Sequence, residues 1–298
     1  MTQVLENDRK PEQRAMHTSP VVSAEAWTAA HRSLEPFVSR RDHRAFLGVS
    51  ALLFLISSAV TIAWCGSMSA MGEMPMPGRW GMSMAWMRMP EQTWVGVAVS
   101  SVGMWLVMMV AMMLPCLVPM LLHFRRTVAG TGKADLGSLT ALAGAGYFFV
   151  WAVLGMAVLP LGFGLAAIEM QQPALARAVP ITTGIVVLIA GALQFSAWKA
   201  HHLACCRQAP ISHRLLLADS GAAWRHGVRL ALHCSRCCAN LMAILLVTGI
   251  MDLRAMALVT GALTLERVAP SADRVTRVIG ITVIGIGLLL IARATRVG

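Results

Sequence analysis

The sequence predicts an all-α fold, a polytopic transmembrane helix bundle of about six spans, from its composition and from the distribution of its apolar residues. Of the 298 residues, 57% are hydrophobic and 13% are charged, whereas ordinary soluble domains carry about 25% charged residues. The apolar residues gather in long uncharged runs, which are typical of membrane spans when they reach about 18 residues. No segment shows the alternating pattern of a membrane β-barrel. The composition therefore argues against a soluble enzyme.

The chain divides into a polar tail at residues 1–44 and a helical membrane domain at residues 45–298. The tail contains Pro11, Pro20 and Pro36 and lacks the apolar core of a signal peptide. We therefore predict a disordered cytoplasmic tail that precedes the first span.

Five uncharged or nearly uncharged runs predict spans. They cover residues 46–72, 93–122, 136–168, 178–198 and 278–292. A helix rises 1.5 Å per residue, so each of the first four runs is long enough to cross a hydrocarbon core of about 30 Å. The last run reaches that length if Arg293 snorkels to the interface. Pro115 and Pro119 remove backbone donors and predict a kink in the second span.

Charged residues interrupt the region from residue 228 to residue 266. We predict one helix over about 228–250 and, after a break, a short apolar helix over 254–266 that spans or re-enters the membrane. Two carboxylates flank this short helix and need cationic partners in an apolar setting. The expected partnerships join these acids to nearby arginines: Asp252 and Glu266 with Arg254 and Arg267.

The positive charges indicate an orientation. The chain has 25 Lys and Arg against 14 Asp and Glu, a net charge of +11, and the basic residues gather in alternate loops, as the positive-inside rule requires of cytoplasmic segments. They are Arg40, Arg41 and Arg44; Arg125, Arg126 and Lys133; Lys199, Arg207, Arg214, Arg225 and Arg229; and Arg293 and Arg296. We therefore expect both termini to be cytoplasmic and no nucleic-acid partner. Arg267, Arg274 and Arg277 are exceptions to the rule.

Methionines crowd the loop after the first span in repeated Met-x-Met spacing. The candidate ligands in this outer loop are Met74, Met76, Met82 and Met84. Thioethers are soft, neutral ligands that select Cu(I) and need no deprotonation. The alternative is an interfacial segment whose Met and Trp side chains lie among lipid headgroups.

The second span carries a sulfur stripe with a step of four residues. The stripe consists of Met104, Met108, Met112, Cys116 and Met120. A step of four keeps residues on one slowly turning helix face. Met113, Cys116 and Met120, beside the two prolines, are the candidate metal ligands. The alternative is that these flexible side chains fill gaps between helices.

The strongest metal-ligand pattern combines two Cys and His clusters. The candidate ligands are His202, Cys205, Cys206, Cys234, Cys237 and Cys238. Residues four apart share a helix face, and the two clusters are expected to meet at the cytoplasmic membrane surface. Cytosolic thiols stay reduced, which favours Cu(I) or zinc over a structural disulfide. Thiol redox chemistry, palmitoylation and simple helix packing are the alternatives.

Several motifs together resemble a known family. They are the run from Met108 to Met120; Gln194 to Lys199 leading to Cys206-Arg207; Cys234-Ser-Arg-Cys237-Cys238; Gly249-Ile-Met251; and Glu266-Arg267. They are similar to those of the bacterial family of predicted metal-binding integral membrane proteins, a domain of unknown function. The resemblance implies a copper-related protein of the bacterial inner membrane. The chain departs from that pattern at His202, Arg236 and Ala239, where the family has Cys, Gly and Trp.

The leading functional hypothesis is a non-enzymatic, chaperone-like protein that binds and transfers Cu(I) between the outer Met-rich loop and the Cys and His cluster. Its expected partners are the lipid bilayer and either a copper enzyme or a soluble copper chaperone. One alternative is a membrane thiol oxidoreductase or a haem- or quinone-binding enzyme, with His202 or His233 as an axial ligand. Another is a non-catalytic accessory subunit of a membrane complex.

Overall fold

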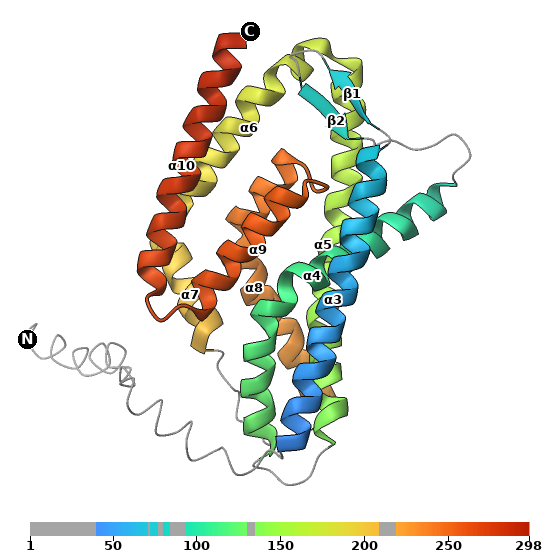
Figure 1. Cartoon of the computed structure of the whole chain (residues 1–298), viewed down its shortest axis with the longest axis vertical. Helices are drawn as coiled ribbons and strands as arrows, with labels where there is room; N and C mark the ends of the chain where they lie inside the picture. The colour runs from blue at the N-terminus through green and yellow to red at the C-terminus, as the bar shows by residue number, and fades with distance from the viewer. Residues whose placement is uncertain are drawn as a thin grey trace, which may run out of the picture.

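The structure is a computed structural model that describes residues 40–70, 72–76, 80–83, 93–129, 135–208 and 219–297. It confirms the all-helical bundle (Figure 1). The helices are α3 (Arg40–Ala70), α4 (Trp94–Ala129), α5 (Leu136–Gln171), α6 (Pro173–Leu193), α7 (Ala197–Gln208), α8 (Ser220–Thr248), α9 (Leu253–Val268) and α10 (Ala272–Val297). Among the described residues, 6 helices are long and apolar enough to cross a membrane, namely α3, α4, α5, α6, α8 and α10. Most of the predicted tail lies outside the described residues.

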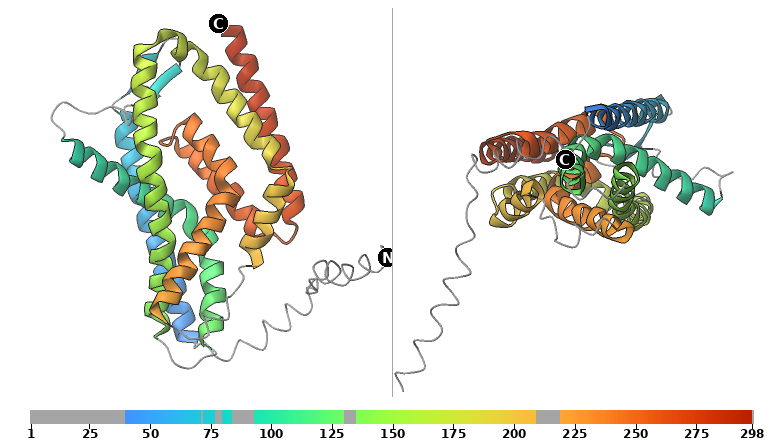
Figure 2. Two further views of the ribbon diagram at one scale, coloured as in Figure 1. Left: turned by 180° about the vertical axis from the view of Figure 1, so that it is seen from behind. Right: turned by 90° about the horizontal axis from the view of Figure 1, so that it is seen from below.

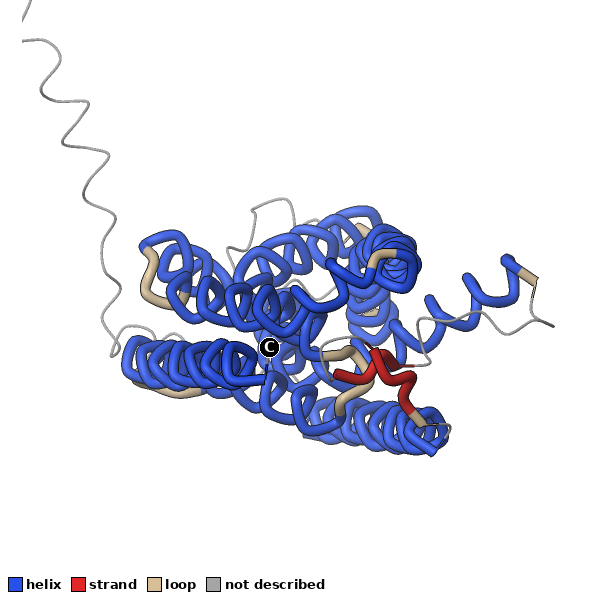
Figure 3. Tube along the Cα trace, turned by 90° about the horizontal axis from the view of Figure 1, so that it is seen from above, coloured by secondary structure: helices blue, strands red, loops and turns tan. Residues whose placement is uncertain are grey.

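The loop after α3 contains two short antiparallel strands that the sequence did not predict. They are β1 (Glu73–Met76) and β2 (Trp80–Ser83). Their register places Met74 opposite Met82. The strands lie at the end of the bundle that faces the viewer in Figure 3. The repeated Met-x-Met spacing therefore belongs, in part, to a hairpin.

Helix α4 changes direction within its length, as its two prolines predict (Figure 1). Pro115 and Pro119 lie inside this single helix, where each removes a backbone hydrogen-bond donor. The first part of α4 projects from the bundle, as Figure 3 also shows. The second part packs between α3 and α5 and carries Met113, Cys116 and Met120 into the core.

Helix α8 begins eight residues before the predicted start at residue 228. Its first turns are amphipathic, because Arg225 and Arg229 are exposed while Ala222 and Gly227 are buried against α5. A helix with one buried face tolerates charges on the other. Cys234 consequently lies near the middle of α8, inside the bundle, and not at the membrane surface where the sequence placed it.

Small residues allow the helices to approach closely. A Cβ on Gly227 would stand 2.0 Å from the carbonyl oxygen of Ala143, which places the backbones of α8 and α5 in direct contact. Helices α6 and α10 are antiparallel: Gly184 lies against Ile291, and Gly280 lies against Phe195. Glycine contacts of this kind are typical of membrane helix pairs.

Helix α9 returns the chain into the bundle between α8 and α10. Gly249 has a φ of +119°, a conformation that favours glycine, and ends α8. The Asp252 carboxylate then accepts hydrogen bonds from the backbone N–H groups of Arg254 and Ala255, at 2.8 and 3.3 Å, and caps α9. The expected partnership between the Asp252 and Arg254 side chains is therefore replaced by a helix cap.

This return places the two ends of the described chain at opposite ends of the bundle (Figures 1 and 2). Helix α3 begins beside the end of α4, where Arg125 Nη2 donates to the Asp42 carbonyl oxygen at 3.5 Å. Helix α10 instead ends beside the first half of α6. The expectation that both termini lie on one side of the membrane counts no pass for α9, whereas a pass by α9 would place them on opposite sides.

Candidate metal centre

Five of the seven cysteines come together in the interior. We call Cys116 of α4, Cys206 of α7 and Cys234, Cys237 and Cys238 of α8 the sulfur cluster; each side chain is at most 1% exposed. All are free thiols. The cluster belongs to a continuous apolar core that also contains Met109 and Met113. Three helices, α4, α7 and α8, therefore supply one region rich in soft ligands.

Cys206 and Cys237 form the direct contact between α7 and α8 in the cluster. Their side chains are joined by a hydrogen bond, and this bond, together with burial, raises the pKa of the Cys206 thiol. The pair unites the two sequence clusters, as the sequence predicted. Two thiols that interact across two helices are suited to bind a small soft ion.

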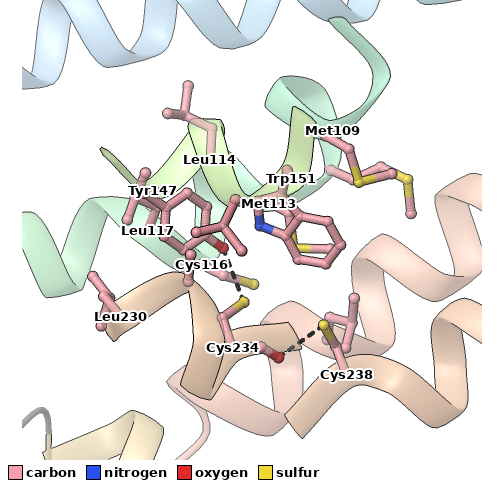
Figure 4. Close-up of a cluster of buried hydrophobic side chains, with 14 of the residues drawn as sticks. Met109, Met113, Leu114, Cys116, Leu117, Tyr147, Trp151, Leu230, Cys234 and Cys238 are labelled. Carbon is pink, nitrogen blue, oxygen red and sulfur yellow. Dashed lines mark hydrogen bonds between the residues drawn. The ribbon is translucent and has the colours of Figure 1, made fainter. Parts of the chain in front are cut away.

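Cys234 has polar neighbours within the otherwise apolar core, and Figure 4 shows it beside Tyr147. Its sulfur lies 2.9 Å from the Tyr147 hydroxyl and accepts a hydrogen bond from Arg267 Nη2 at 3.0 Å. Cys238 donates its thiol hydrogen to the Cys234 carbonyl oxygen at 2.9 Å. On the other side, Cys116 Sγ lies 3.7 Å from the Thr264 hydroxyl. The Cys234 sulfur therefore accepts from one cationic donor, Arg267, and lies within hydrogen-bond distance of a hydroxyl that can donate or accept.

A buried ion pair lies beside the cluster. Lys199 Nζ is 2.8 Å from Glu266 Oε2, with both side chains 1% exposed. Lys199 also donates to the carbonyl oxygen of Cys237 at 2.7 Å, and Gln194 Nε2 donates to Glu266 at 2.8 Å. The expected partner of Glu266 was Arg267, but α7 supplies Lys199 instead. Lys199 is therefore an interior residue and does not mark a cytoplasmic loop.

The remaining predicted ligands of α7 lie on its periphery. Cys205 Sγ is 3.7 Å from His201 Nε2. His202 is half-buried against Trp198, and its Nδ1 has no hydrogen-bond partner among the described residues. Burial, and then the electrostatic effects of His201 and Arg236, lower the pKa of His202. A neutral imidazole is the form that binds metal.

The thioethers form two groups. Met113 and Met120 are buried in the core, as is Met76 at the end of β1. Met74 and Met82 are paired strand residues, and Met84 lies outside the described residues. At the same end of the bundle as the hairpin, Cys65 Sγ lies 3.8 Å from Met251 Sδ. This sulfur pair was not predicted, because its two residues are far apart in sequence.

The geometry restricts the type of metal site. Within the described parts of the chain, no three His, Cys, Asp or Glu side chains are close enough to hold one ion. A tetrahedral zinc site needs such a set, whereas Cu(I) is satisfied by two thiolates. The structure brings Cys206, Cys234, Cys237, Cys238 and Cys116 together and leaves His202 and Cys205 outside that cluster.

Sequence reasoning missed two residues of the site. Arg267 was predicted to lie in a loop, and Tyr147, in an apolar span, was not predicted to have a role. One signal was present for Arg267, because Glu266-Arg267 is a charged pair at the end of an otherwise apolar helix. Charges in such a place usually have a partner or a function.

Comparison with known proteins gives one family. A family model described as "PpoB2: Copper chaperone" matches residues 102–290. No curated protein and no solved structure gives a significant match. The matched region contains the sulfur cluster, Lys199, Glu266 and Arg267, and it covers well over half of the chain. The chain therefore belongs to the PpoB2 copper chaperone family.

Proposed function

We propose that this protein binds Cu(I) inside the membrane and passes it between partner proteins. The observation that carries the proposal is the contact of Cys206 with Cys237 in a buried core rich in sulfur. Thiolates and thioethers are the ligands that Cu(I) prefers. The Cys206–Cys237 pair is the primary site, and Cys234 and Cys116 are its nearest alternatives.

Further soft ligands support a route through the bundle. Toward the hairpin end, Met113 and then the Cys65–Met251 pair continue the sulfur-lined core. Met74, Met76, Met82 and Met84 would exchange metal with the outside at that end. On the opposite side of the cluster, Cys205 and His202 provide ligands at the surface of α7. Each step exchanges sulfur or imidazole ligands, so the ion need not enter apolar surroundings unligated.

The helices and the family support the proposed cellular setting. Six candidate spans are consistent with a bacterial inner-membrane protein embedded in lipid. A copper chaperone has copper as its cargo and delivers it, which makes a copper enzyme or a soluble copper chaperone the expected partner and catalysis unnecessary. Zinc is the competing cargo, and the described residues argue against it because they contain no close set of three ligands.

Metal titration of the purified full-length protein tests the proposal. Under anaerobic conditions with a chromogenic Cu(I) chelator as competitor, we expect wild type to hold Cu(I) and the double variant Cys206→Ser, Cys237→Ser to lose the tightest site. Serine removes the thiolates while keeping a similar volume. Ser235→Ala, in the same part of α8, is the control and should bind as wild type. Negligible binding by wild type, or equal binding by the double variant, would overturn the proposal.

The same thiol contact also suits a dithiol oxidoreductase. Such a protein would join Cys206 and Cys237 in a disulfide and pass two electrons and two protons to a quinone. Alkylation of the cysteines followed by mass measurement separates the two functions. A quinone-dependent loss of two alkylation sites, in a protein that binds no Cu(I), would favour the oxidoreductase.

A further inference from the structure

We propose that Arg267 balances the charge of the metal complex in the sulfur cluster and thereby selects a monovalent soft ion. This inference rests on the proposed function, because it assigns a residue to the same copper site. The residue is a positioning group that does not itself ligate the metal.

Arg267 is a buried cation for which no carboxylate partner is found among the described residues. It is 8% exposed and lies on α9, directly after Glu266. Glu266 is already paired with Lys199, so these two charges cancel. Among the described residues, the hydrogen-bond acceptor of Arg267 is the sulfur of Cys234, at 3.0 Å. An arginine is always charged, and an unpaired charge in an interior is strongly unfavourable.

The donors of Arg267 are only partly used. Its Nε and Nη1 atoms are buried and have no hydrogen-bond partner in the described chain. The guanidinium group interacts electrostatically with Cys234, Cys116 and Cys206, which come from three helices. A planar fork with free donors, held at the centre of a group of thiols, is suited to an anionic metal–thiolate complex.

Charge balance then favours a monovalent ion. When Cu(I) binds two cysteines, their two thiol protons leave to solvent and the complex carries a net charge of −1. The single positive charge of Arg267 neutralises it. A divalent ion with the same two thiolates is neutral and leaves Arg267 without a counter-charge. It would need a third thiolate, and no close set of three ligands exists in the described residues.

Arg267 is held in place independently of the metal. Glu266 is anchored by Lys199 of α7 and by Gln194, which donates to it at 2.8 Å. The neighbouring residue on the same helix is therefore fixed relative to α7 and to the end of α6. A metal site whose surrounding charges are held rigidly needs little reorganisation on binding.

A comparison of Ag(I) with Cd(II) tests the inference. Both ions are soft, and they differ in charge. In the full-length protein, Arg267→Met should lower the affinity for Ag(I) relative to Cd(II) by about 10- to 100-fold, the usual cost of losing a residue that supports a metal ligand. Arg267→Lys, which keeps the charge, should retain most of the preference. Arg254→Met removes an exposed arginine from the same helix and is the matched control.

The outcomes separate this inference from the proposed function. A wild-type protein that binds neither Cu(I) nor Ag(I) contradicts the proposed function itself. A wild-type protein that binds Ag(I), with an unchanged Ag(I)-to-Cd(II) ratio in Arg267→Met, overturns only the role of Arg267. If Arg267→Met does not fold, the test uses the wild-type protein and measures how much of each ion protects Cys206 and Cys237 from alkylation. Equal protection by Cd(II) and Ag(I) at the same concentration would also overturn the proposed role of Arg267.

Discussion

The ion pair between Lys199 and Glu266 is the residue-scale feature on which the site depends. Its two charges are buried and lie 2.8 Å apart. Removal of one partner leaves the other charge uncompensated, which costs about 3–5 kcal/mol in buried pairs. We therefore expect Glu266→Gln to lower the free energy of unfolding by about that amount, measured by thermal or denaturant unfolding in detergent.

A double variant provides the control for this prediction. Lys199→Met with Glu266→Leu removes both charges, and replacement of a whole buried pair by apolar side chains is often neutral. The double variant should therefore be more stable than Glu266→Gln alone. If Glu266→Gln unfolds as wild type does, the pair contributes little and its proposed role in anchoring Arg267 fails.

The cysteines in the sequence predicted that a cluster of sulfur ligands exists. Which residues belong to the sulfur cluster depends on contacts between helices. Cys206 and Cys237 were found from sequence because residues four apart on two helices share faces. Arg267 and Lys199 were wrongly predicted to lie in loops. A charged residue near the end of an apolar run looks the same in the sequence whether it lies in a loop or inside the bundle. Only the position of α9, which depends on packing against α4, α7 and α8, distinguishes the two.

At the scale of elements, the contact between α5 and α8 determines where Cys234 lies. A Cβ on Gly227 would stand 2.0 Å from the Ala143 carbonyl oxygen, which belongs to backbone and cannot rotate away. Gly227→Ala should therefore separate the helices and destabilise the protein by about 1–3 kcal/mol. The measurement is again unfolding in detergent, together with Cu(I) affinity, which should fall as the cysteines of α8 move.

Gly144, on the same part of α5, gives the matched control. A Cβ there would meet nothing within 4 Å. Alanine is the better helix former by up to about 1 kcal/mol, so Gly144→Ala should leave stability unchanged or raise it slightly. Equal stability of the Gly227→Ala and Gly144→Ala variants would show that the backbones of α5 and α8 are not in direct contact at Gly227.

The elements were largely predictable from hydropathy, and their boundaries were less so. Long apolar runs gave α3, α4, α5, α6 and α10 because a membrane core requires a continuous apolar helix. The start of α8 was missed because its first turns bury only one face. The hairpin was missed because its residues, rich in Met, Gly and Pro, lack the alternation expected of a strand.

At the scale of the whole molecule, the return of α9 makes a prediction about topology. The starts of α3, α5 and α8 and the end of α4 share one end of the bundle. The described basic residues of these helix ends, among them Arg44, Arg126 and Arg225, lie near it. The positive-inside rule makes this end cytoplasmic. Because α10 ends at the opposite side, we expect the C-terminus outside, with Arg293 and Arg296 as exceptions to the rule.

Reporter fusions measure this arrangement. Green fluorescent protein fluoresces in the cytoplasm, and alkaline phosphatase is active only outside it. A C-terminal phosphatase fusion should be active, whereas a phosphatase inserted between α4 and α5 should be inactive and serves as the control. A fluorescent C-terminal fusion with no phosphatase activity would restore the arrangement that the sequence predicted, with both termini inside.

The late position of α9 in the chain also bears on how the protein matures. All seven cysteines precede α9 in the sequence, but Glu266 and Arg267 are synthesised after them. A chain that has inserted only as far as α8 therefore contains every thiol and lacks the guanidinium that would balance a thiolate complex. On the proposed function, synthesis order would leave the copper site unfinished in an incomplete chain, and loading would wait for α9.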